Sequence, residues 1–241
     1  MSNVLFKQDF IDVLNELKVE QGSLICLQAN LSKFPNVLGG YQTLFDAIWE
    51  VIGEDGCIMI PSFTYSSLDP ACMGIYYDYQ DWQQIREEMP GYNTALTMSD
   101  VNSLCVNQFM MQKGVIRSNH PVYSFVFKGN MSMDWVKQTM NYPISFGHVL
   151  KGFAHRKAYN ILIGFDKEES VLLPAIAKTI GIGSVQVEKA YVQTAKKKMV
   201  KTYLNVKCDL EQRKELLEYC YVKESMISNQ VISCLSIEEL A

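Results

Sequence analysis

Histidine is the side chain best suited to exchange a proton near neutral pH, and His120 is one of only three histidines in this chain. Pro121 follows it directly. A proline fixes its own backbone φ angle and biases the preceding residue toward an extended conformation, so the imidazole of His120 is held in a defined direction. Ser118 and Ser124 flank the pair within reach of a common pocket. The spacing is compatible with a general base, but by itself it favours a turn histidine bonded to the backbone.

Aromatic residues alternate with carboxylates in a second segment, Tyr76-Tyr77-Asp78-Tyr79-Gln80-Asp81-Trp82. Aromatic rings stack on sugars and carboxylates attract amines, so this mixture fits a substrate site. An irregular loop that packs on its own side chains explains the same residues. The sequence leaves both interpretations open.

The composition is that of an ordinary soluble globular protein, with 241 residues of which 48% are hydrophobic and 20% charged. A net charge of −4 argues against a nucleic-acid surface, because phosphate binding needs clustered lysine and arginine. The one basic run, Lys196-Lys197-Lys198, is short and is typical of a solvated edge strand or turn. Neither a membrane span nor a signal peptide is indicated, so we expect a cytoplasmic protein.

The cysteines predict neither a disulfide framework nor a metal site. There are seven of them, an odd number, and no two form a CxxC pair. We therefore expect buried free thiols and no bound metal.

The first 60 residues predict a βαβ unit. Apolar positions from Phe6 to Leu17 have helical spacing, and an amphipathic helix is expected to end near Gly22. The short apolar runs Ser23–Leu27 and Cys57–Ile60 suit buried strands, and Tyr41–Ile52 between them has the pattern of a helix. Such a unit normally makes parallel neighbours joined by a right-handed crossover, which predicts an α/β fold.

The rest of the chain also alternates helix and strand patterns. We predict one domain over residues 1–241, with a central mostly parallel or mixed sheet flanked by helices. Residues 61–100 predict a long surface excursion that carries binding residues. The expected helices are Val101–Met111, Met133–Met140 and Leu210–Tyr219, the expected strands are Ser124–Phe127 and Tyr159–Gly164, and Val185–Val187 with Val200–Val206 form a late antiparallel pair.

Several segments in order along the chain resemble the aminoglycoside 3-N-acetyltransferase family. They are Gly22-Ser23-Leu24-Ile25, Asn36-Val37-Leu38-Gly39-Gly40, Gly53-Glu54-Asp55-Gly56-Cys57-Ile58-Met59-Ile60-Pro61-Ser62-Phe63 and Arg117-Ser118-Asn119-His120-Pro121-Val122-Tyr123-Ser124, followed by Phe146-Gly147 and Leu162-Ile163-Gly164. The resemblance covers roughly residues 8–190, and the Arg-Ser-x-His-Pro-x-x-Ser segment is its most specific part. It implies an α/β fold, acetyl-CoA as cosubstrate and an amine of an amino sugar, aminoglycoside or sugar nucleotide as acceptor. The sequence is compatible with a homo-oligomer but does not indicate the oligomeric state.

The resemblance also implies roles for individual residues. His120 corresponds to the histidine that acts as general base on the acceptor amine, and Ser124 is the candidate for orienting His120 or the donor. Coenzyme A carries a pyrophosphate, which suits backbone amides at a helix start, so Asn36, Val37, Gly39 and Gly40 are expected to bind it, unless they form only a helix-entry turn. Arg117, beside Ser118, either pairs with a phosphate or braces the loop through a carboxylate.

The chain departs from the family at several positions of the expected site. Gln28-Ala29-Asn30 stands where relatives have His-Ser-Ser, and Leu150-Lys151 stands where they have Ser-Pro. The family's Thr-x-x-His-x-x-Glu element aligns with residues 170–176, where Leu173 and Ile176 replace the histidine and the glutamate. The nearest carboxylates in sequence that could replace this acid are Asp166, Glu168 and Glu169, although loop carboxylates are usually solvated.

Three functions are compatible with these residues. The first is N-acetyl transfer from acetyl-CoA to an amino sugar. The second is binding of a sugar or partner protein without catalysis, which the lost family residues favour. The third keeps acyl transfer but changes the donor or the acceptor.

Overall fold

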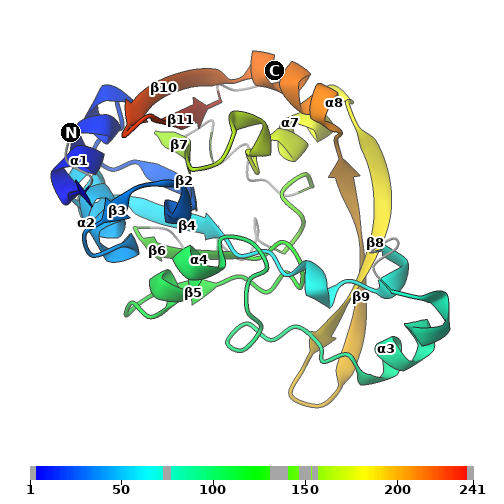
Figure 1. Ribbon diagram of the computed structural model, residues 1–241. Helices are drawn as coiled ribbons and strands as arrows, with labels where there is room; N and C mark the ends of the chain where they lie inside the picture. Colours follow the sequence, from blue (N-terminus) through cyan, green and yellow to red (C-terminus); the bar gives the residue numbers. More distant parts are fainter. Residues whose placement is uncertain (1–3, 73–76, 131–140, 147–152, 154–156, 238–241) are drawn as a thin grey trace.

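The computed structural model describes residues 4–72, 77–130, 141–146, 153 and 157–237. The helix predicted over Met133–Met140 lies outside them. A seven-stranded sheet forms the centre of the molecule (Figure 1). Its strands, in spatial order, are β10 (Tyr221–Ile227), β11 (Gln230–Ser236), β7 (Ala158–Ile163), β2 (Leu24–Ala29), β4 (Cys57–Pro61), β6 (Phe125–Gly129) and β5 (Ile116–Arg117).

The sheet is mixed. Its three middle strands, β7, β2 and β4, are parallel to one another, and every other pairing is antiparallel. All six residues of β2 are buried, as expected of a strand that is covered on both faces. The fold class predicted from the sequence is therefore confirmed, and so is the βαβ unit formed by β2, α2 (Tyr41–Ile52) and β4.

Helices cover one face of the sheet. α1 (Lys7–Glu16), α2 and α4 (Ser103–Met110) pack against strand residues such as Ile25 and Ile58. The alternate residues of the same strands, including Cys26 and Met59, face a second core on the other side of the sheet. This second core contains α7 (Leu173–Ile180), the end of α8 (Leu210–Leu216) and residues of a long hairpin.

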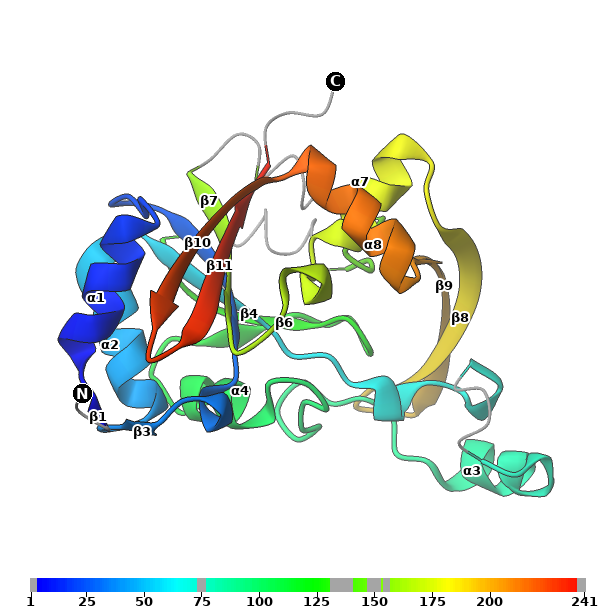
Figure 2. The same cartoon turned by 45° about the horizontal axis from the view of Figure 1, so that its top comes forward.

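The long hairpin consists of β8 (Ser184–Gln193) and β9 (Lys198–Lys207), which pair antiparallel over their full length. It lies at the opposite end of the molecule from α1 and α2 (Figures 1 and 2). The predicted late antiparallel pair is confirmed, and it is longer at both ends than the valine pattern indicated. The predicted turn at the lysine run joins the two strands, and Lys198 begins β9.

Some elements were not predicted. Within the excursion 61–100 the chain forms α3 (Trp82–Glu88), and the Lys198 ammonium donates hydrogen bonds to three carbonyls at its end, those of residues 86, 87 and 89. The β10–β11 hairpin extends the sheet beyond β7. The remaining short elements are strands β1 (Val4–Leu5) and β3 (Asn36–Val37) and the 3-10 helices Leu31–Lys33, Tyr65–Ser67, Pro70–Cys72, Tyr79–Asp81, Lys167–Glu169 and Leu217–Tyr219.

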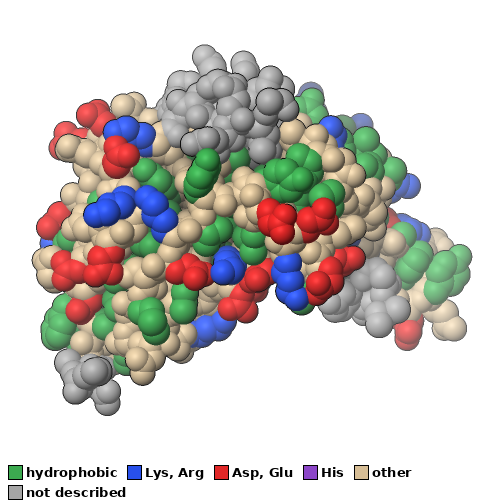
Figure 3. Space-filling view, turned by 90° about the horizontal axis from the view of Figure 1, so that it is seen from above, with side chains coloured by type: hydrophobic (Ala, Val, Ile, Leu, Met, Phe, Trp, Pro, Cys, Tyr) green, Lys and Arg blue, Asp and Glu red, His purple; other side chains and the backbone are tan. Residues whose placement is uncertain are grey.

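The surface mixes charges of both signs. Acidic and basic side chains lie next to one another on the face seen in Figure 3. Among the described residues, no helix is both long and apolar enough to cross a membrane.

Candidate functional site

A cavity of about 690 Å³ lies at the carboxyl ends of the three parallel strands. Gln28 on β2, Pro61 on β4 and Phe165 just after β7 line it. In α/β sheets, ligands bind at this edge of the sheet, outside the carboxyl ends of the strands. Tyr123 and the β9 residue Asn205 also contribute to the lining. The volume is within the range of sites for drug-sized ligands.

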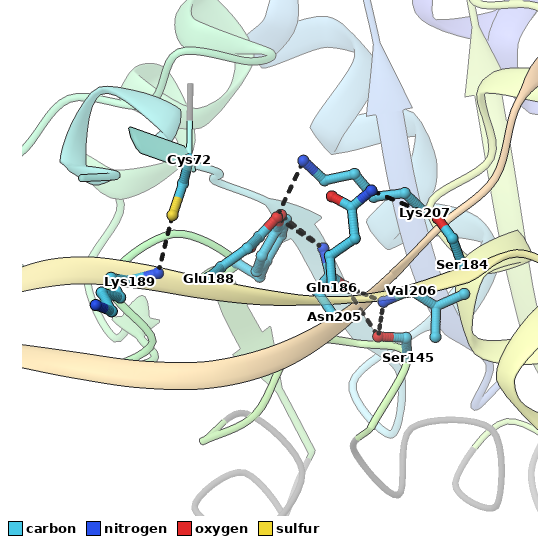
Figure 4. Close-up of polar contacts among 10 residues, drawn as sticks. Cys72, Ser145, Ser184, Gln186, Glu188, Lys189, Asn205, Val206 and Lys207 are labelled. Atoms are coloured by element: carbon cyan, nitrogen blue, oxygen red, sulfur yellow. Dashed lines mark hydrogen bonds and ion pairs between the residues drawn. The ribbon is translucent and has the colours of Figure 1, made fainter. Parts of the chain in front are cut away.

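A polar network between the long hairpin and Tyr123 forms part of the cavity wall (Figure 4). The Tyr123 hydroxyl donates to the carboxylate of the β8 residue Glu188, with its oxygen 2.9 Å from Oε2 and 3.1 Å from Oε1. The Asn205 amide donates to the Tyr123 hydroxyl at 2.7 Å, and the Lys207 ammonium lies 3.2 Å from Glu188 Oε1. Burial and then the Glu188 charge raise the pKa of Tyr123, so it stays a protonated donor.

No local pattern in the sequence indicates this network. Glu188 lies between residues of ordinary strand type, and the exposed Val185 and Val187 precede it. The usual alternation would place the valines inside and the carboxylate outside, but the hairpin buries Glu188 and Asn205 instead. Only the hairpin register, which pairs Glu188 with Tyr203, could have placed these residues on one inner face.

His120 is fully buried at the start of the turn that leads to Tyr123. Its Nδ1 accepts hydrogen bonds from two backbone amides, those of Val122 at 3.2 Å and Tyr123 at 2.9 Å. Burial, and then the positive charge of Lys201, lowers the pKa of His120 well below its usual value. The imidazole is therefore neutral, and because Nδ1 accepts two hydrogen bonds, the ring proton resides on Nε2.

Ser124 and Arg117 form a cluster of their own beside the His120 turn. The Ser124 hydroxyl donates to the Ser62 carbonyl at 2.8 Å, and the two hydroxyl oxygens lie 2.9 Å apart. Arg117 Nε donates to both hydroxyls at 3.2 Å, and its two terminal nitrogens donate to the carbonyls of Ser62 and Thr97. Arg117 thus braces the loop through hydroxyls and carbonyls rather than through a carboxylate.

The other residues predicted to bind coenzyme A lie away from the cavity lining. Ser118 accepts a hydrogen bond from the Phe125 amide at 2.9 Å and closes the turn between β5 and β6. Asn36 and Val37 form β3, which pairs with β1, and the Gly39-Gly40 turn enters α2 with positive φ at both residues. Their roles toward coenzyme A stay predictions.

The positions where the family residues are lost are filled by the core and by internal hydrogen bonds. Leu173 and Ile176 on α7 are fully buried in the second core. The Gln28 amide donates to the Glu169 carbonyl at 3.0 Å and accepts from the Val171 amide at 2.9 Å. These groups hold the chain between β7 and α7 against the end of β2.

The three carboxylates proposed from sequence to replace the family acid lie after β7. Glu168 and Glu169 line the cavity, and Glu169 accepts a hydrogen bond from the Asp166 amide at 2.9 Å. No hydrogen bond or ion pair joins any of the three to His120 within the part of the chain that the structure describes. Within that same part, no cluster of three or more His, Cys, Asp or Glu side chains has the geometry to hold a metal ion.

The aromatic segment around Tyr79 makes a few internal contacts, although residues 77–81 are exposed and Tyr76 lies outside the described residues. The Tyr79 and Trp82 rings lie 5.1 Å apart, Arg86 lies over the Trp82 ring, and the Trp82 indole donates to the Tyr77 carbonyl at 3.2 Å. Tyr77 and Asp81 also line a second cavity of about 700 Å³. The packing and the substrate interpretations are thus both compatible with the geometry.

Two sequence relatives indicate the family of this chain. The chain is 29% identical over 218 residues to the SPbeta prophage-derived aminoglycoside N(3')-acetyltransferase-like protein YokD of Bacillus subtilis. This alignment covers 88% of this chain and 78% of YokD. It is 30% identical over 122 residues to aminoglycoside N(3)-acetyltransferase IX of Micromonospora chalcea, covering 48% of this chain and 41% of that enzyme.

Solved structures share the fold. The crystal structure of YokD superposes with a TM-score of 0.81 at 26% identity, over 96% of this chain and 88% of YokD. AAC-IIIb in a binary complex with CoASH gives a TM-score of 0.76 at 13% identity, over 97% and 92% of the two chains. AAC-VIa bound to sisomicin gives 0.72 at 16% identity, over 96% and 92%. The model of the family described as aminoglycoside 3-N-acetyltransferase matches residues 27–241, and this chain belongs to that family of N-acetyltransferases.

Proposed function

We propose that this protein transfers the acetyl group of acetyl-CoA to an amine of an aminoglycoside or a related amino sugar. Family membership supports the reaction class. Relatives of the same fold have been solved with CoASH and with sisomicin, which supports the choice of donor and acceptor.

The observation that carries the proposal is the cavity at the carboxyl ends of β2, β4 and β7. Its volume of about 690 Å³ accommodates a drug-sized acceptor. Its lining carries two carboxylates, Glu168 and Glu169, and two cations, Lys207 and Arg213, and the buried Glu188 pairs with Lys207. Carboxylates in the wall of a cavity pair with the ammonium groups of amino sugars, which are protonated at neutral pH.

In the proposed reaction, the acceptor nitrogen attacks the thioester carbonyl carbon and gives up a proton. The carbon–sulfur bond then breaks, and the thiolate takes up a proton to leave as free coenzyme A. The tetrahedral intermediate carries negative charge on the former carbonyl oxygen, which hydrogen-bond donors stabilise.

The general-base role of His120 stays a prediction, and its hydrogen bonds set a condition on it. To accept a proton at Nε2, the imidazole must first carry its ring proton on Nδ1, which faces two backbone N–H groups. In the described arrangement Nε2 is a donor, a form that suits the developing oxyanion. His120→Asn keeps an acceptor oxygen near the Nδ1 position and removes Nε2, so it isolates what Nε2 contributes.

The test is release of free thiol from acetyl-CoA in the presence of sisomicin or apramycin, with mass spectrometry of the product. We expect the acceptor to gain one acetyl group, and His120→Asn to lose turnover while it keeps its affinity for coenzyme A. Absence of thiol release with both aminoglycosides and with glucosamine would contradict the proposal.

A second candidate function is binding of an amino sugar without acetyl transfer. The full burial of Leu173 and Ile176, at the positions of the family's histidine and glutamate, favours it. Calorimetry separates the two functions, because a binding protein of this kind takes up sisomicin but releases no thiol from acetyl-CoA.

A further inference from the structure

Two carboxylates are buried in the described part of the chain, and they are neutralised differently. Asp69 accepts two hydrogen bonds from the Arg86 guanidinium, at 2.9 and 3.0 Å, and another from the Tyr191 hydroxyl at 2.8 Å. This fork fixes both partners and suits a permanent structural pair. Glu188 has instead the ammonium of Lys207, a single point charge at the end of a flexible chain.

The neutral neighbours of Glu188 cannot replace this cation. Tyr123 donates one proton to the carboxylate, and the Asn205 amide lies at 3.5 Å, the outer limit of a hydrogen bond. A buried carboxylate without a counter-charge is strongly destabilising. Lys207 is the only cation paired with Glu188 among the described residues, so the stability of the ionised carboxylate depends on it.

Lys207 is placed where another cation can take over. Its side chain is 44% exposed and lines the cavity, whereas the Glu188 side chain is 2% exposed and lies behind it. Figure 4 shows the lysine amine and the Asn205 amide approaching the same carboxylate oxygen, Oε1, from different directions. If the ammonium of Lys207 swings into solvent, Glu188 Oε1 faces the position that it leaves.

We propose that Glu188 anchors an ammonium group of the acceptor and that Lys207 holds this position until the acceptor binds. The assignment rests on the proposed function, from which the cationic acceptor comes. Exchange of one ammonium for another keeps the Glu188 carboxylate neutralised. Because folding has already removed water from this carboxylate, binding of the acceptor does not have to desolvate it again. A neutral sugar cannot displace Lys207, because a hydroxyl would leave the buried charge unbalanced.

The anchor is coupled to His120 through the chain. The hydroxyl of Tyr123 holds Glu188, while the backbone amide of the same residue donates to His120 Nδ1 at 2.9 Å. One residue thus orients both side chains, and an acceptor held at Glu188 is held at a fixed position relative to the imidazole.

Calorimetry with sisomicin in the absence of acetyl-CoA tests the anchor, with glucosamine as a minimal amine and glucose as a neutral control. Lys207→Met removes the competing ammonium, and we expect it to tighten sisomicin binding about tenfold, while Glu188→Gln weakens binding at least about tenfold. Lys7→Met is the matched control, because Lys7 is 47% exposed and pairs with Glu50 at 2.6 Å outside the cavity lining. It leaves the affinity unchanged.

Thermal unfolding distinguishes a change in binding affinity from a loss of folded protein. Lys207→Met leaves Glu188 unpaired and lowers Tm, and sisomicin should raise the Tm of this variant more than that of the native protein. The double variant Glu188→Gln with Lys207→Met should recover Tm without gaining affinity. Equal ligand-induced shifts in the native protein and in Lys207→Met would overturn the anchor.

The anchor and the proposed function fail separately. Sisomicin binding that tightens in Lys207→Met, without any thiol release from acetyl-CoA, supports the anchor and contradicts acetyl transfer. Thiol release with an affinity and a KM that Lys207→Met and Glu188→Gln leave unchanged supports acetyl transfer and contradicts the anchor. Failure of every variant to bind sisomicin at millimolar concentration also contradicts the anchor.

Discussion

The imidazole of His120 meets the ring of Tyr203 edge-on, with the ring centroids 4.6 Å apart. Each ring carries a buried polar atom, His120 Nε2 and the Tyr203 hydroxyl oxygen, that has no hydrogen-bond partner by geometry among the described residues. Buried polar groups in folded proteins are normally bonded, and exceptions gather where function uses them. We therefore expect substitutions of His120 or Tyr203 to change stability and function in different ways.

We predict that burial of His120 makes the protein less stable in mild acid. The unfolded chain binds a proton near the usual imidazole pKa of 6.5, whereas the folded protein, whose His120 pKa is well below that, does not. Below pH 6.5 the unfolded state binds more protons, so the free energy of unfolding falls as the pH falls. Between pH 7.5 and 5.5 the loss should be on the order of 1 kcal/mol, measured by urea unfolding.

His120→Asn provides the comparison, because asparagine does not titrate in this range. The variant should lose less stability over the same pH interval than the native protein, whatever its stability at pH 7.5. Identical pH dependence in both proteins would show that His120 takes up a proton in the folded state.

Arg117→Lys tests whether Arg117 braces the loop or binds a phosphate of coenzyme A. Lysine cannot reproduce the fork that reaches Ser62, Ser124 and the Thr97 carbonyl, so the free energy of unfolding should fall by roughly 2 kcal/mol. The KM for acetyl-CoA should change little. A raised KM with unchanged stability would assign Arg117 to the phosphate instead.

The fold could be predicted where the apolar pattern was continuous. The buried run Cys57–Ile60 and the helical spacing of Tyr41–Ile52 depend on local sequence, and both elements form as expected. β11 could not be placed in this way, because its position beside β7 depends on long-range pairing. The same holds for α3, which packs in a segment without a periodic pattern.

Candidates for the site could be chosen only where the local sequence carries them. His120 and Arg117 could be selected because one short segment carries them. Glu188 and Lys207 come from separate strands, and Glu188 meets Tyr123 only because the hairpin packs across the cavity. A carboxylate that acts through the tertiary structure leaves no local signature, which is why the sequence directed attention to the loop at Asp166–Glu169 instead.

Asn160→Asp tests the polar support beneath the cavity. Asn160 is fully buried in β7, its amide donates to the Cys26 carbonyl at 2.8 Å, and its oxygen accepts from the Ser170 hydroxyl at 2.5 Å. Aspartate has the same shape but would set an oxygen against the Cys26 carbonyl. We expect the free energy of unfolding at pH 7 to fall by about 3 kcal/mol or more. Ser170→Ala, which removes only the neutral hydroxyl, should cost less, and the reverse order would contradict this account.

Restoring the family's lost carboxylate should not restore a family-like site. Ile176 is fully buried on α7 in the second core, so Ile176→Glu would place an ionised group among apolar side chains without a partner. We expect a loss of several kcal/mol or an insoluble protein at pH 7, whereas Ile176→Val should cost only about 1 kcal/mol. Thermal unfolding of the two variants measures the difference. A stable Ile176→Glu protein with increased acetyl transfer would show that α7 can turn this position toward the cavity, and that Glu188 is not the carboxylate on which the site depends.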